Sequence, residues 1–133
     1  MTADWKTRAD EYRAEVLASI PEAWRLPAGF KLTDDVRHVA ETSGILTPAE
    51  VKLLAQDATS LAANVAAKKY TAVEVATAYC KSAAVAHQTT NCLMDFFPDE
   101  ALARARELDR ILEETGKVVG PMHGVPLSIK GKI

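Results

Sequence analysis

The sequence has 133 residues, of which 48% are hydrophobic and 26% charged, and its formal net charge is −2 at pH 7. This hydrophobic share is that of a globular chain and excludes wholesale disorder, and the length suits one domain or a piece of a larger one. The nearly balanced charge argues against a dedicated nucleic-acid-binding protein, which carries a basic excess on one face.

Membrane and secretory classes are also disfavoured. No run approaches the roughly 20 apolar residues of a membrane-spanning helix, and the charged N-terminus lacks the apolar core of a signal peptide. The two cysteines, Cys80 and Cys92, are too few for a disulfide framework and too far apart for a CxxC motif, so we interpret them as free buried thiols. We therefore expect a cytoplasmic chain that binds neither nucleic acid nor a membrane.

The first predicted element is an amphipathic helix over residues 3–20, which Pro21 ends. Its apolar stripe consists of Trp5, Ala9, Tyr12, Val16 and Ile20. Residues 21–43 contain Pro21, Pro27 and Gly29 and show no clear period, which predicts an extended arm lying on the rest of the protein. The residues expected to anchor this arm are Trp24, Leu26, Phe30 and Leu32.

Two capping boxes mark the next helices. Thr47 and Glu50 flank a proline at the first helical position and predict a helix to about residue 57. A short helix is expected from residue 59 or 60 to about 67, and Thr71 with Glu74 opens a helix to about residue 87. One face of that last helix is made of small residues and is expected to be buried against a large neighbour: Val73, Ala76, Thr77, Cys80 and Ala84.

The pattern then changes to strand, helix, strand. Residues 91–97 are apolar and aromatic and end at Pro98, which predicts a strand. A helix is expected from Pro98 to Gly116, with Ala101, Ala105, Leu108 and Leu112 as its buried stripe. After a turn-rich loop at residues 120–124, residues 125–130 are the second predicted strand. The fold class is therefore α/β, and because two strands make no stable sheet, we interpret the chain as a mostly helical N-terminal fragment of a larger α/β/α protein.

Few residues carry a chemical signal of their own. The three histidines, His38, His87 and His123, lack metal-ligand spacing, and no phosphate-binding glycine motif is present, so we expect neither a metal nor a cofactor. Lys130 directly follows the second predicted strand, at the edge where catalytic groups gather in open α/β sheets. By position alone this signal is weak, because most lysines at strand ends are solvated surface groups.

Two stretches, however, resemble the amidase signature family in its fungal acetamidase or general amidase branch. They are residues 86–93 continuing through 99–109, and residues 120–130 with the sequence GPMHGVPLSIK; residues 20–26 and 44–47 fit the same branch. The resemblance implies an α/β/α hydrolase of linear amides with a Ser–cis-Ser–Lys triad, in which Lys130 is the triad lysine. It also implies that both catalytic serines lie downstream in a glycine- and serine-rich segment, so we expect Ser128 to be structural.

The sequence contains no such glycine- and serine-rich segment. By this resemblance, residues 1–133 are the N-terminal part of one amidase domain, with a helix and arm over 1–45 and the start of the α/β core over 46–133. The chain then holds one of three triad members and is expected to be inactive alone. Residues 131–133 depart from the family, which has Asp or Glu after the lysine. Because Gly-Lys can be encoded GGT-AAG, one hypothesis is an unspliced intron, which sequencing the transcript through the codon for Lys130 tests.

Alternative functions remain open at this point. The chain is also compatible with a non-catalytic helical module that pairs with a full-length homologue, with one chain of a split amidase, or with a homo-oligomer. Cooperative thermal unfolding favours the module, aggregation favours a fragment, and a co-purifying serine-rich partner favours the split enzyme. The family branch alone implies the substrate, a small aliphatic or aromatic amide such as acetamide.

Overall fold

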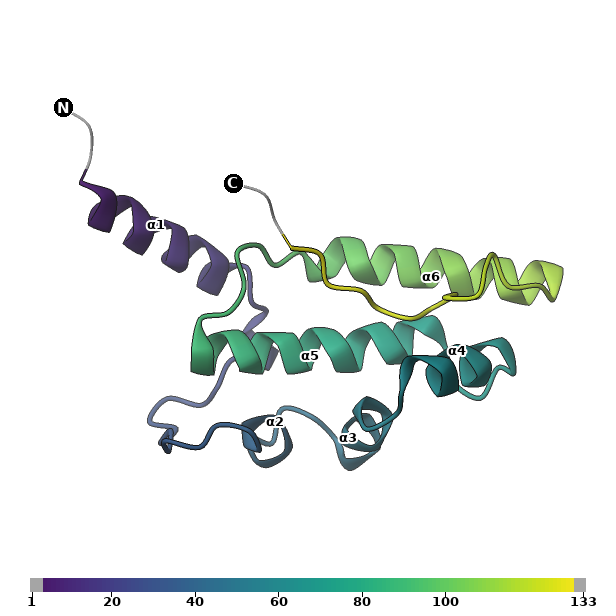
Figure 1. Cartoon of the computed structure of the whole chain (residues 1–133), viewed down its shortest axis with the longest axis horizontal. Helices are drawn as coiled ribbons and strands as arrows, with labels where there is room; N and C mark the ends of the chain where they lie inside the picture. Colours follow the sequence, from purple (N-terminus) through teal and green to yellow (C-terminus); the bar gives the residue numbers. More distant parts are fainter. Residues whose placement is uncertain (1–3, 131–133) are drawn as a thin grey trace.

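The computed structural model describes residues 4–130, and this part of the chain forms helices and irregular segments with no β-strand. Figure 1 shows α5 running through the middle of the molecule, with α6 alongside it and α2 and α3 on its other side. The elements in chain order are α1 (Trp5–Ala18), the 3-10 turn η1 (Glu22–Trp24), α2 (Val39–Thr42), α3 (Pro48–Leu54), α4 (Ala58–Ala66), α5 (Ala72–Thr90) and α6 (Pro98–Thr115).

Both predicted capping boxes are confirmed. The Thr47 hydroxyl accepts the Glu50 N–H at 3.2 Å, and the Glu50 carboxylate accepts the Thr47 N–H at 2.7 Å. The Thr71 and Glu74 pair does the same at 3.0 and 2.8 Å. Each box satisfies two backbone donors that the first helical turn leaves without a partner, which explains why α3 and α5 begin where the sequence predicts.

The core lies on two faces of α5. One face packs on α3 and α4, where the fully or nearly fully buried side chains are Leu53, Leu61, Val65, Val75 and Ala78. The other face meets α6 through Ala72, Ala76 and Ala105. Burying one Leu or Val side chain contributes about 1.5–3 kcal/mol, so the first face supplies more hydrophobic stabilisation than the second, whose alanines let α5 and α6 approach closely.

The predicted extended arm, residues 21–43, contains η1 and α2 and is therefore only partly extended, and Gln88 of α5 makes hydrogen bonds to it. Its Oε1 accepts the Leu26 N–H at 2.8 Å, and its Nε2 donates to the carbonyl oxygens of Trp24 at 2.9 Å and Ala84 at 3.0 Å. Leu26 and Phe30 pack on the cluster of Val39, Leu46 and Val85, which confirms them as anchors. Leu32 is 47% exposed, so its expected anchoring role is wrong.

Helix α1 lies where the sequence predicts, but most of its predicted apolar stripe is not buried. It extends away from the body of the molecule (Figure 1), and within its stripe only Val16 and Ile20 are buried, while Trp5 is 72% exposed. A helix buries its apolar stripe only where another element covers it. The Tyr12 hydroxyl donates to Asp95 at 3.1 Å, which ties the middle of α1 to the connector between α5 and α6.

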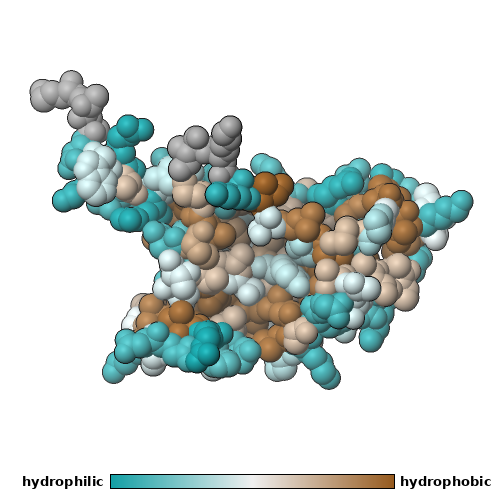
Figure 2. Space-filling view, viewed as in Figure 1, coloured by the Kyte–Doolittle hydropathy of each residue, from teal (hydrophilic) through white to brown (hydrophobic). Residues whose placement is uncertain are grey.

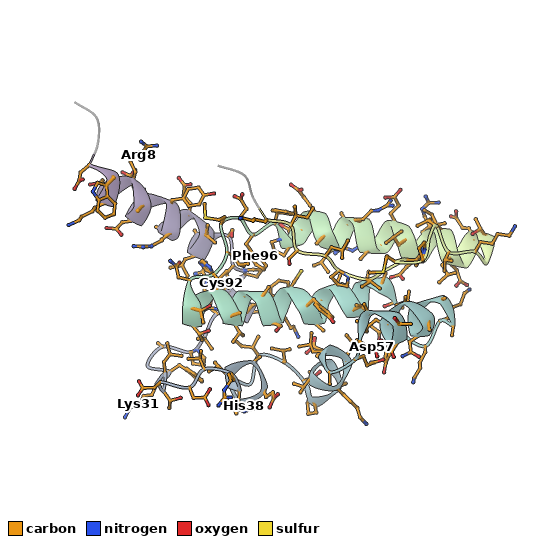
Figure 3. All side chains as sticks on the ribbon, in the orientation of Figure 1. Arg8, Lys31, His38, Asp57, Cys92 and Phe96 are labelled. Carbon is orange, nitrogen blue, oxygen red and sulfur yellow. The ribbon has the colours of Figure 1, made fainter. Side chains whose placement is uncertain are left out.

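Neither predicted strand forms within residues 4–130. Residues 91–97 turn around the end of α5 instead: Asn91 adopts a left-handed conformation (φ 54°), and the Leu93 N–H donates to the His87 ring rather than to a neighbouring strand. Cys92 and Phe96 lie in this connector (Figure 3). Residues 125–130 have no regular structure either, because a strand needs a partner for its backbone N–H and C=O groups and the described chain offers none.

The burial predicted for the small-residue face of α5 is partly wrong. Ala76 and Ala84 are buried, but Val73, Thr77 and Cys80 are only half-buried, although Val73 packs beside α6 with Ala76 and Ala105. Cys92 is exposed, which corrects its interpretation as a buried thiol, and partial burial raises the pKa of the Cys80 thiol. Among the helices of residues 4–130, none is both long enough and apolar enough to cross a membrane.

Candidate active-site segment

The segment that carries Lys130 begins with a compact loop after α6. The His123 N–H donates to the Gly120 carbonyl at 3.2 Å, and the Val125 N–H donates to the Met122 carbonyl at 3.1 Å. The Val119 N–H donates to Nδ1 of His123 at 3.2 Å, so the histidine closes the loop on itself. These short-range bonds give residues 119–125 a defined shape without strand partners.

Gly124 seats this loop on the helices. Its φ is +76°, a conformation that L side chains rarely adopt, and a Cβ there would lie 3.0 Å from Cγ1 of Val65 and 3.1 Å from Cβ of Ala72. The next residue, Val125, packs against the buried cluster of α3, α4 and α5. Only glycine therefore fits between the loop and the start of α5, and the sequence pattern GPMHGVP has a structural reason at this position.

Two of the three histidines are buried. His87 is 2% and His123 3% exposed, whereas His38 lies at the exposed edge of the molecule (Figure 3). In both buried rings Nδ1 accepts a backbone N–H, which fixes the neutral tautomer with the proton on Nε2. Neither Nε2 has a hydrogen-bond partner within residues 4–130, and no cluster of three or more metal-binding side chains occurs in this part of the chain.

Acidification is expected to destabilise the fold through His87. Burial lowers the pKa of His87 below its ordinary 6.5, so the unfolded chain takes up this proton first as the pH falls. The stabilisation is complete above about pH 6.5 and is lost below it, because the protonated Nδ1 can no longer accept the Leu93 N–H. We expect the free energy of unfolding to fall more between about pH 7.5 and 5.5 in the wild type than in a His87→Gln variant.

Urea denaturation followed by circular dichroism at the two pH values measures this difference. His38→Gln is the matched control, because His38 is exposed. Equal pH dependence in the wild type and His87→Gln would contradict the prediction.

Lys130 lies at the exposed end of an apolar segment. Leu127 is 75% and Ile129 91% exposed, and both Ser128 and Lys130 are exposed as well. Figure 2 shows hydrophobic side chains on this face along the C-terminal segment. No element within residues 4–130 buries Lys130, and the described chain brings no other predicted catalytic group to it.

A groove of about 520 Å³ runs beside this segment, between the loop, α5 and α6. Its lining is mostly apolar and includes Ala76, Leu108 and Pro126, with His123 and Arg104 as polar members. Arg104 pairs with Glu107 on the exposed side of α6. The groove is open, and Leu127 and Ile129 are exposed, for the same reason: no element within residues 4–130 covers this apolar surface.

Two residues that position this segment were not singled out by the sequence. For His123, no pattern in the sequence indicated its burial or its role in closing the loop. Asp109 was expected only as part of a resemblance, yet its carboxylate accepts the backbone N–H groups of Ala72 at 2.6 Å and Val73 at 3.0 Å. A bond between residues 37 positions apart has no local signature, and the one available hint was an acid among the apolar positions of α6.

Comparison with known proteins gives a consistent result. Residues 74–133 match the model of the family described as Amidase. The chain is 44% identical over 132 residues to an acetamidase of Aspergillus oryzae and 45% identical over 135 residues to a putative amidase of Schizosaccharomyces pombe. These alignments include 99% and 100% of this chain but only 24% and 25% of the relatives, so the chain spans about a quarter of their length.

A solved structure is similar as well. The described fold matches that of a fatty acid amide hydrolase with a TM-score of 0.75 and 33% sequence identity. The match covers 94% of this chain and 23% of the solved chain. The helical arrangement around α5 is therefore shared with a much longer protein.

Proposed function

We propose that this chain, which is similar to amidases over nearly its whole length, belongs to the amidase family and forms the N-terminal part of an amidase that hydrolyses carbon–nitrogen bonds of linear amides. The observation that carries the proposal is the similarity to fungal acetamidases over nearly the whole chain, including the segment that ends at Lys130. The substrate class we propose is small aliphatic or aromatic amides such as acetamide, in the cytoplasm.

In this proposal Lys130 is the base of a Ser–cis-Ser–Lys triad whose serines lie outside this chain. A serine hydroxyl is a poor nucleophile at neutral pH and needs a base to take its proton as it attacks the amide carbonyl. The neutral amine of Lys130 would receive that proton through the bridging serine. The lysine would then return the proton to the leaving amine, and water would hydrolyse the acyl-enzyme.

The exposure of Lys130 supports the view that these residues are inactive alone. An ammonium group cannot accept a proton, and a lysine is neutral near pH 7 only where burial disfavours its charge. Leu127 and Ile129 are exposed beside it, and the segment has no strand partners. We propose that segments present in the longer relatives cover this surface and bury Lys130.

A chimera tests this function directly. Residues 1–130 of this chain replace the matching quarter of the Aspergillus oryzae acetamidase, which supplies the remaining three quarters; we call this protein the chimera. We expect it to release ammonia from acetamide, whereas the 133-residue chain alone should not. A chimera that folds, as judged by a cooperative thermal transition, but hydrolyses no amide would contradict the proposal.

The exposed apolar segment also favours a second candidate, one chain of a split amidase. The separate test is to express the 133-residue chain together with the remaining three quarters of the acetamidase as a second polypeptide. Hydrolysis that requires both chains would support the split enzyme. Two chains that purify apart and show no activity would exclude it.

A further inference from the structure

The first turn of α5 is held by two independent devices. Its local capping box satisfies the Glu74 N–H through the Thr71 hydroxyl. The N–H groups of Ala72 and Val73, which the box does not reach, donate to the two carboxylate oxygens of Asp109 on α6, at 2.6 and 3.0 Å. Because both oxygens are used, Asp109 fixes where the start of α5 lies on α6, whereas the box fixes only that a helix starts there.

The residue that Asp109 holds is the one on which the loop before Lys130 rests. A Cβ on Gly124 would lie 3.1 Å from Cβ of Ala72 and 3.5 Å from its Cα, so the loop contacts the first residue of α5 directly. Ala72 itself is fully buried. A shift of the start of α5 therefore moves the surface against which Gly124 is seated.

We propose, on the basis of the proposed amidase function, that Asp109 is a positioning residue for Lys130, acting through the Ala72 backbone and Gly124. Lys130 is six positions after Gly124, and extended chain of that length spans about 20 Å at about 3.3 Å per residue. A rotation of about 3° at Gly124 moves the far end of such a segment by about 1 Å, and a displacement of that size reduces turnover by up to about 100-fold.

Amide hydrogen exchange in the 133-residue chain tests the structural half of the proposal. We expect Asp109→Ala to speed exchange of the Val125 N–H, which bonds to the Met122 carbonyl, by at least about 10-fold. Asp109→Asn keeps one acceptor oxygen and should give a smaller effect, and it serves as well if the alanine variant does not fold. Glu114→Gln is the matched control, because it removes an exposed carboxylate of α6 that pairs with Arg110 and not with α5.

Turnover in the chimera tests the functional half. At temperatures well below the unfolding transition and per folded molecule, we expect Asp109→Ala to lower kcat by about 10- to 100-fold while KM changes by less than about twofold. Asp109→Asn should recover part of the loss, and Glu114→Gln should retain wild-type kcat. A fall in kcat at nearly constant KM distinguishes positioning from stability. Replacing a residue that only stabilises the fold lowers the amount of folded protein and leaves kcat per folded molecule unchanged.

The outcomes distinguish the two proposals. Unchanged Val125 exchange, or a kcat per folded molecule that stays at the wild-type value in an active chimera, would overturn the role of Asp109 alone. An unsubstituted chimera that folds but hydrolyses no amide would contradict the amidase function, and with it the catalytic consequence of Asp109.

Discussion

Replacing Lys130 by alanine is expected to reduce amide hydrolysis by the chimera by at least about 10³-fold. The reason is chemical: without an amine at this position, nothing accepts the proton of the nucleophilic serine, and removal of one member of a catalytic triad costs about as much as removal of the whole. Lys130→Arg should be equally inactive, because it preserves the positive charge but a guanidinium is never neutral near pH 7.

Ser128→Ala is the matched control for this prediction. Ser128 lies two residues before Lys130 in the same exposed segment, and we expect it to be structural. Steady-state rates of ammonia release from acetamide, normalised to folded chimera, give the comparison. If Lys130→Arg retains activity, the lysine acts through its charge and not as a base; if Ser128→Ala is as inactive as Lys130→Ala, the nucleophile lies within this chain and the assignment of the serines is wrong.

The helices could be predicted because their signals are local. Thr47 with Glu50, and Thr71 with Glu74, specify helix starts within four residues, and Gly116 in a left-handed conformation (φ 66°) ends α6 where expected. The C-terminal end of α5 was placed three residues early, at 87 rather than 90. Nothing in residues 88–90 stops a helix, and the left-handed Asn91 that does so has no proline or glycine to mark it.

The strands could not be predicted reliably, because a strand is a property of two segments. Residues 125–130 have a strand-like sequence, but their apolar side chains Leu127 and Ile129 are exposed and their backbone has no neighbour within residues 4–130. Residues 91–97 fail for a different reason: the ring of His87 takes the Leu93 N–H and turns the chain. The sequence pattern records a preference for extended backbone, and pairing decides whether it becomes a sheet.

The candidate site, too, has one part that the sequence indicates and another part that only the structure shows. Lys130 was found only through the resemblance of residues 120–130 to a family, because a lysine after an apolar run has no signature of its own. The contacts that support it, from Asp109 to Ala72 and from Ala72 to Gly124, join three elements distant in sequence. Such contacts leave no periodicity or spacing, and only the structure brings them together.

Replacing Gly124 by alanine is expected to lower the free energy of unfolding by about 2–4 kcal/mol. Two costs add: a left-handed φ of +76° costs an L-residue about 1–2 kcal/mol, and a methyl group 3.0 Å from Val65 and 3.1 Å from Ala72 adds an overpacking cost of similar size. Gly29→Ala is the matched control, because Gly29 has nearly the same φ, +83°, but nothing within 4 Å of its added methyl group. Gly29→Ala should lower the free energy of unfolding by only about 1–2 kcal/mol.

The difference between these two variants, measured by urea denaturation, isolates the close approach of the loop to α4 and α5. Equal losses of unfolding free energy in the two variants would contradict this close approach. The loss at Gly124 also has an upper limit, because the loop can detach from the helices once the strain exceeds the free energy that docks it. In that case the urea midpoint stops falling while the Val125 N–H, bonded to Met122 in the docked loop, exchanges as in unfolded chain. A detached loop would leave α3 to α6 folded and release only the segment that carries Lys130, so the same substitution should inactivate the chimera more than it destabilises the helices.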